Sequence, residues 1–152
     1  MINESAPWKR ELRRLKSQLR KLSSKPVNDE IADFQLERPV LYSAVVVRRL
    51  IESQKVTDKT RAREYPVEFY PTRLERHDAL LRQTMRGDIE KEFDLEAPQP
   101  GVMDAWNITS ELLHGGFVNW DLGEEEQLTG IFVTSKRNHM ERLVRIPLSE
   151  YF

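Results

Sequence analysis

The sequence predicts an α+β fold in which three to four helices pack on a C-terminal three-stranded antiparallel β-meander, preceded by a basic amphipathic helix. Two observations predict this class. Before the glycine pair at 115 and 116, apolar residues recur every three or four positions, the period of a helix. After the pair they alternate with polar residues, the period of a half-buried strand. We therefore expect a basic helical arm at residues 1–26 and one α+β domain at residues 27–152.

The composition excludes several classes of protein. The chain has 152 residues, of which 39% are hydrophobic and 32% charged. That balance is typical of a soluble protein with a buried core, and no apolar run approaches the roughly 20 residues that span a bilayer. The absence of cysteine excludes disulfides, thiolate nucleophiles and most structural zinc sites. A reducing cytoplasm is compatible with the absence of cysteine, so we expect a cytoplasmic protein without a membrane span or a cofactor.

The predicted N-terminal helix opens with Ser5 as its N-cap and Pro7 in its first turn. Its apolar stripe, at helical spacings of three and four, consists of Trp8, Leu12, Leu15, Leu19 and Leu22. Its other side carries the cations Lys9, Arg10, Arg13, Arg14, Lys16, Arg20 and Lys21. Three arrangements are open. The stripe docks on the chain's own domain, it pairs with a partner helix or a second copy of the chain, or the helix lies on phosphates of nucleic acid or membrane.

The charge is divided unevenly along the chain. Residues 1–26 hold eight Lys or Arg and two acidic residues, a net charge of +6. The remaining residues hold 16 basic and 23 acidic side chains, a net charge of −7. A basic arm on an acidic body is the strongest asymmetry in the chain, and the acidic body argues against general coating of nucleic acid.

A second helix is expected at residues 30–55, after a polar linker at residues 23–29. Pro39 either opens this helix or kinks it. The run Val45–Val47 is also compatible with a buried strand, but the apolar pattern continues beyond it and favours a helix. The wide buried face of this helix is predicted to contain Val40, Leu41, Ala44, Val45, Val47, Leu50 and Ile51.

Extended and helical segments follow. The prolines that bracket residues 65–71 favour a short edge strand or an extended segment. Thr72 and Glu75 form a capping box for a helix that ends near Gly87. An acidic segment then leads to a loop at residues 97–101, where two prolines and a glycine stand close together.

The helix that reaches the glycine pair is predicted to bury one side and to end at Gly115 with a φ that a side chain would oppose. That buried side contains Val102, Ala105, Trp106, Thr109, Leu112 and Leu113. The three strands of the meander are marked by the alternating sets Val118, Trp120 and Leu122, then Ile131 and Val133, then Val144, Ile146 and Leu148.

His114, in the last turn of that helix, is the histidine with the best claim to chemistry. The negative end of the helix dipole favours its protonated form, and an imidazole is a common general acid or base. The alternative is a terminal histidine that bonds a free backbone carbonyl. Asn107, two turns upstream, could orient His114 or a phosphate, but it cannot supply a cation to a developing oxyanion.

The last hairpin gathers a second basic cluster. Its members are Lys136, Arg137, His139, Arg142 and Arg145, with the aromatic residues Trp120 and Phe132 nearby. Such a cluster could contact phosphates and stack on a base. The alternative is a solvated hairpin tip.

Three short motifs carry a resemblance. Arg48–Glu52 on an early helix, Leu112–His114 before aromatic strands, and Gly130–Ser135 in the meander together resemble a family of small uncharacterised bacterial proteins, over roughly residues 35–152. The resemblance implies a layout and no settled activity. A more remote similarity to HEPN-type ribonucleases rests on His114 near a helix end. The arginine of that motif is replaced here by Asn107, and a β-meander is foreign to that all-helical fold.

These observations predict a non-catalytic accessory protein that binds a protein partner or nucleic acid. The contact residues would be Arg10, Arg13, Arg14, Arg20, Lys21, Lys136, Arg137 and Arg142. The alternative is a small metal-independent HEPN-like ribonuclease, a toxin or defence component, with His114 and Asn107 in its active site. No metal site is expected, since His77, His114 and His139 show no zinc-type spacing.

Overall fold

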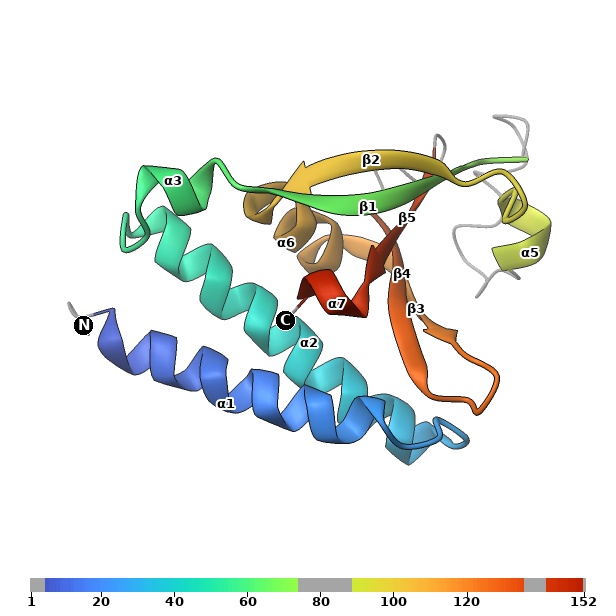
Figure 1. Ribbon diagram of the computed structural model, residues 1–152, viewed down its shortest axis with the longest axis horizontal. Helices are drawn as coiled ribbons and strands as arrows, with labels where there is room; N and C mark the ends of the chain where they lie inside the picture. The colour runs from blue at the N-terminus through green and yellow to red at the C-terminus, as the bar shows by residue number, and fades with distance from the viewer. Residues whose placement is uncertain (1–4, 74–88, 136–141, 152) are drawn as a thin grey trace.

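The computed structural model describes residues 5–73, 89–135 and 142–151, and within these ranges the chain is α+β with six helices and five strands (Figure 1). The helices are α1 (Ala6–Ser23), α2 (Glu30–Glu52), α3 (Asp58–Arg61), α5 (Ile89–Glu92), α6 (Ala105–Leu113) and α7 (Leu148–Tyr151). The strands are β1 (Glu64–Pro71), β2 (Gln99–Asp104), β3 (Gly115–Leu122), β4 (Leu128–Ser135) and β5 (Arg142–Pro147).

The α+β class is confirmed, but the expected three strands and three to four helices are too few. Three of the helices, α3, α5 and α7, are single turns of four residues, too short for a helical period to show in the sequence. The helix expected between Glu75 and Gly87 lies outside the described residues.

The five strands form one antiparallel sheet in the order β2-β1-β5-β4-β3. β3, β4 and β5 make the expected meander, and β1 and β2 extend it beyond β5. Residues 65–71 are therefore not an edge strand, because β1 pairs on both sides. Pro66 is tolerated because the β1–β5 ladder begins only at Glu68, so that Pro66 lies where β1 pairs with β2 alone.

The segment before α6 is a strand, where the sequence predicts a loop and the start of the helix. β2 pairs with β1, and α6 begins only at Ala105, with the Asp104 side chain accepting a hydrogen bond from the Asn107 backbone at 2.7 Å. Gly101 explains why the sequence predicts a loop where the structure has a strand. A Cβ atom at this position would come within 2.1 Å of the Phe69 ring, so the glycine is needed for a cross-strand aromatic contact rather than for a turn.

The change of period at the paired glycines is confirmed, because α6 ends at Leu113 and β3 begins at Gly115. The predicted backbone at Gly115 is wrong: none of the described glycines has a positive φ. Close approach is the reason for a glycine here. An added Cβ would lie 3.0 Å from the carbonyl oxygen of Glu111, so any side chain at 115 would push β3 away from the end of α6.

α1 and α2 form an antiparallel helical hairpin (Figure 1). Ser5 stands at the N-cap of α1 as predicted, although its side chain makes no capping bond. Leu15 and Leu19 are only 2% and 1% exposed. The stripe of Leu12, Leu15, Leu19 and Leu22 therefore docks on the chain's own domain, the first of the three arrangements. Its two buried leucines have no surface left for the partner helix or second copy that the stripe also suggested.

The sheet has one face toward the helices and one outer face, since alternate residues of a strand point to opposite sides. The main core lies between the helices and the sheet. Its buried members are Leu19, Leu36, Val40, Ala44, Val67, Met103, Ile108, Leu112, Leu128, Ile131, Val133, Val144 and Ile146. A smaller core of Tyr70, Phe93, Phe132 and Leu143 lies on the outer face, packed against Ile89 and Leu95 of the α5 region.

Several residues expected in the core are exposed. Val102 and Leu122 lie on the edge strands β2 and β3, and Leu122 follows a register shift in the β3–β4 ladder. Trp106 is 37% exposed because it lies on the side of α6 away from the sheet, against Arg48 of α2. Trp120, in contrast, packs partly buried against the main core as predicted.

Candidate binding surface

α6 carries both residues that the sequence marks as candidate catalytic groups. Asn107 lies in its first turn and His114 is its C-cap, and both are exposed. The His114 backbone donates to the carbonyl of Ser110 at 3.0 Å. Since seven positions correspond to about two helical turns, Asn107 and His114 lie on the same side of α6, open to solvent. Among the described residues no group of three or more His, Cys, Asp or Glu could hold a metal ion.

The basic hairpin of the sequence analysis is only partly described. Lys136, Arg137 and His139 lie outside the described residues. The Arg142 guanidinium lies 4.0 Å from the centroid of the Phe69 ring, a cation–π contact across the β1–β5 pair. This cation is therefore engaged by the chain's own aromatic ring instead of being presented at a hairpin tip.

Arg145 is the centre of an ionic network on the outer face of the sheet. Its Nε and Nη2 atoms lie 2.8 and 2.6 Å from one carboxylate oxygen of Asp121, and its Nη1 lies 3.0 Å from Glu68. The Tyr70 hydroxyl donates to the same Glu68 oxygen at 2.9 Å. Gly130 leaves room for this arrangement, because a Cβ there would lie 3.1 Å from Arg145 Nε.

This network satisfies its own charges. Burial opposes the charge on Arg145, but the hydrogen bonds and charges of Asp121 and Glu68 outweigh burial and raise its pKa. Burial, followed by the hydrogen bond to Glu68, raises the pKa of Tyr70 to about 12. A pocket of about 650 Å³ lies beside these groups. Two carboxylates face one guanidinium, so the network is acidic and does not suit a phosphate.

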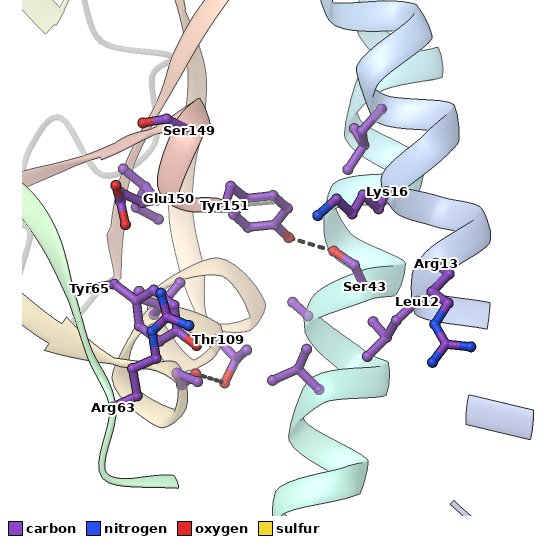
Figure 2. Close-up of a pocket in the computed structure, with 16 residues that line it drawn as sticks. Leu12, Arg13, Lys16, Ser43, Arg63, Tyr65, Thr109, Ser149, Glu150 and Tyr151 are labelled. Atoms are coloured by element: carbon purple, nitrogen blue, oxygen red, sulfur yellow. Dashed lines mark hydrogen bonds between the residues drawn. The ribbon is translucent and has the colours of Figure 1, made fainter. Parts of the chain in front are cut away.

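A second cavity, of about 390 Å³, lies between the helical layer and the sheet, lined by α1, α2, α6 and α7 (Figure 2). Tyr151 points across it toward α2, with its hydroxyl 2.5 Å from Ser43 Oγ and 2.9 Å from the Val40 carbonyl oxygen. Thr109 donates to the Ala105 carbonyl at 2.8 Å. These hydroxyls bond to one another or to backbone, whereas the charged groups of Arg13, Lys16, Arg63 and Glu150 also line the cavity (Figure 2).

The outward side of α1 has a different character, because its charges point to solvent. Its exposed cations are Lys9, Arg10, Arg13, Arg14, Arg20 and Lys21, and all five predicted contact residues of this helix are among them. Arg14 also pairs with Glu11 of the same helix at 2.6 Å, and that hydrogen bond raises the pKa of Arg14 and lowers the pKa of Glu11.

α2 carries an exposed apolar row that the sequence analysis missed. Ile31, Phe34, Tyr42 and Val45 are 68%, 61%, 42% and 46% exposed. We call these four residues the apolar stripe of α2. Val45 is predicted to be buried, and that prediction is wrong. The sequence does contain a signal for this row, because α2 has apolar residues on two opposite sides. A helix that is covered on one side needs apolar residues on that side only.

α1 and the apolar stripe of α2 belong to neighbouring helices, since α1 packs along α2 in the helical hairpin (Figure 1). On the other flank of α2, the Arg48 guanidinium lies 3.1 Å from the centroid of the exposed Trp106 ring and donates to Ser110 Oγ at 2.6 Å. We refer to the exposed cations of α1, the stripe of α2 and the Arg48–Trp106 stack together as the helical surface.

Comparisons of this chain with protein-family models, with curated proteins and with solved structures find no match. Of the helices that the structure describes, none is both long and apolar enough to cross a membrane.

Proposed function

We propose that this chain is a non-catalytic binding protein of the bacterial cytoplasm, which contacts an acidic macromolecular partner through the helical surface. The observation that carries the proposal is the orientation of α1. Because Leu15 and Leu19 are buried against the rest of the chain, α1 is anchored, and its exposed cations stand on the sides of the helix that do not pack. A cluster of like charges raises the rate at which an opposite charge is captured.

The charge distribution supports an acidic partner over a symmetric dimer formed through α1. Residues 1–26 carry a net charge of +6. Two such surfaces placed face to face would repel each other, whereas an acidic surface would be attracted. The Arg145 network argues less for binding, since its charged groups bond to one another.

A charge reversal with a matched control tests the proposal. Arg10→Glu/Arg13→Glu changes two exposed cations of α1, and Lys59→Glu/Arg61→Glu makes the same net change at exposed positions of α3. Fluorescence anisotropy would follow labelled poly-glutamate and a labelled DNA duplex added to the full chain at two salt concentrations.

We expect poly-glutamate to bind the unchanged chain, to bind about tenfold more weakly to the α1 variant, and to weaken as salt rises. The α3 variant should bind like the unchanged chain. Equal losses in the two variants would show a response to net charge alone and would overturn the proposed role of α1. If the duplex binds more tightly than poly-glutamate, and the α1 variant loses that binding, the partner is nucleic acid and not an acidic protein.

A further inference from the structure

The cavity between the helical layer and the sheet is larger than ordinary packing leaves. Protein interiors are close-packed, and voids larger than a water molecule are few, whereas this cavity has a volume of about 390 Å³. Small side chains leave the room for it, since Ser43 and Ala44 of α2 and Ala105 of α6 all line it. Pockets that bind small molecules have volumes of about 300 to 1,000 Å³ and mainly apolar linings, so the size of this cavity suits a small ligand.

The inner part of the cavity offers apolar surface and few free polar groups. Four buried apolar side chains line it, namely Leu19, Ala44, Ile108 and Ile146. The hydroxyls of Ser43, Thr109 and Tyr151 also line it, but they already bond to one another or to backbone. A ligand with many polar groups, such as a sugar, would leave some of them without a hydrogen-bond partner, which is costly. The inner part therefore suits an apolar body.

The charged groups of the cavity include more cations than carboxylates. They are Arg13, Lys16, Arg63 and Glu150, and no other carboxylate of the described residues lines the cavity. Arg13 and Arg63 are exposed, so they stand where the cavity opens to solvent. Neither makes an ion pair with a residue that the structure describes. Even apart from Lys16, which has an interaction of its own within the chain, two cations stand against one carboxylate.

Arg63 is placed to receive a ligand that enters the cavity. Its guanidinium lies 5.0 Å from the centroid of the Tyr65 ring, on the sheet side of the cavity (Figure 2). A guanidinium stacked on a ring still has its N–H donors at its edge, and those donors match the two oxygens of a carboxylate. On the opposite side, Lys16 extends from α1 toward Tyr151 (Figure 2). The mouth of the cavity is therefore cationic and its interior apolar.

We propose that this cavity binds a small organic monocarboxylate, whose apolar body lies among the inner side chains and whose carboxylate meets the cationic mouth. A single negative charge fits better than a phosphate, because Glu150 also lines the cavity and repels a second negative charge. The site is distinct from the helical surface, with which it shares only Arg13. Small-molecule binding and partner binding can therefore succeed or fail separately.

Probes with one apolar chain and different head groups test the charge of the ligand. Isothermal titration calorimetry measures the binding of octanoate, octanol, octylamine and octyl phosphate to the full chain at neutral pH. We expect octanoate to bind about tenfold more tightly than octanol, and octylamine to bind most weakly. Equal affinities, or tightest binding of octylamine or octyl phosphate, would overturn the monocarboxylate. If none of the four binds, the cavity is not a ligand site.

A matched pair of variants tests the cationic mouth. Arg13→Gln/Arg63→Gln removes the two exposed cations of the mouth, and Arg10→Gln/Arg61→Gln makes the same change at exposed positions outside the cavity. We expect the mouth variant to bind octanoate about tenfold more weakly and to bind octanol as the unchanged chain does. The control should bind both probes like the unchanged chain. Equal losses of octanoate affinity in the two variants would show a response to net charge and would overturn the site.

A second matched pair fills the cavity. Ala105→Leu adds a larger side chain at the half-buried start of α6, and Ala62→Leu adds the same side chain at an exposed position after α3. We expect Ala105→Leu to weaken octanoate and octanol alike, because the apolar body loses its room, and Ala62→Leu to weaken neither. Far-UV circular dichroism checks folding, and Val47→Phe, at another half-buried lining position, replaces Ala105→Leu if that variant does not fold. Octanoate that binds the filled cavity as tightly as the unchanged one would overturn the proposal.

Discussion

The outer face of the sheet and the helical surface contain the same kinds of residue but use them differently. On the outer face, Arg145 is bonded to Asp121 and Glu68, and the Tyr70 hydroxyl donates to Glu68. On the helices, Arg10 and Arg13 point to solvent. The difference shows that a cluster of basic and aromatic residues in a sequence does not by itself mark a binding site. What matters is whether the chain supplies the partners of those residues itself.

The largest effect should come from the contact that holds α1 in place. Leu19→Ala removes a side chain that is 1% exposed, and we expect it to lower the free energy of unfolding by about 3 kcal/mol, since it leaves a cavity. Leu122→Ala, on the exposed edge of β3, serves as the control and should cost well under about 1 kcal/mol. Urea denaturation measures both. Equal costs would show that α1 is not anchored to the core.

Removal of the ionic partner on the sheet should have the next largest effect. Arg145→Ala leaves Asp121 and Glu68 without their cation on a partly buried surface, and we expect a loss of about 2 kcal/mol in unfolding free energy. Arg13→Ala removes an exposed cation from α1 and should change stability by less than about 0.5 kcal/mol. Equal losses of unfolding free energy in the two variants would contradict the claim that Arg145, unlike Arg13, is bonded within the chain.

The raised pKa values of two tyrosines predict that the folded state becomes less stable at alkaline pH. Burial is the main cause for both Tyr70 and Tyr151, whose pKa values rise from about 10 to about 12. Because the folded state holds these protons more tightly, their contribution to stability is complete below pH 10 and is lost as pH rises toward 12. Thermal unfolding between these pH values should show a falling melting temperature. Tyr151→Phe should reduce the slope, and an unchanged slope in that variant would contradict the assignment.

The smallest effect is expected at the histidine. His114 is exposed at the end of α6, so His114→Ala should change the unfolding free energy by less than about 0.5 kcal/mol and should leave binding to the helical surface unchanged. A fluorogenic RNA substrate tests the alternative function. Cleavage by the unchanged chain that disappears in His114→Ala would support the ribonuclease and argue against a purely binding protein.

Much of the fold could be predicted from residue periods. The stripe of α1, the long α2, the meander and the switch at Gly115 are all local patterns, and a local pattern is enough to mark a helix or a strand. β2 was missed because Gly101 and its neighbouring prolines are ordinary loop signals. Their role in the strand depends on Phe69, which is distant in sequence. Such cross-strand contacts override local propensity.

The candidate site was only half predictable. The cations of α1 follow from the sequence, since their opposite side is apolar. Val45, however, has the same local pattern as the buried Ala44 beside it, and only the positions of α1, α6 and the sheet around α2 decide which of the two is exposed. The engagement of Arg145 by Asp121 likewise depends on the order of strands in the sheet, which residue periods do not determine.

The central claim is that the helical surface, and not the sheet, receives the partner. Titration of the full chain with poly-glutamate, followed by NMR of the backbone amides, tests it most directly. The account predicts that the amide resonances of Arg10 and Arg13 shift as poly-glutamate is added, while those of Val102 and Leu122 stay in place. Shifts confined to Val102 and Leu122, or shifts of equal size at all four residues, would contradict it.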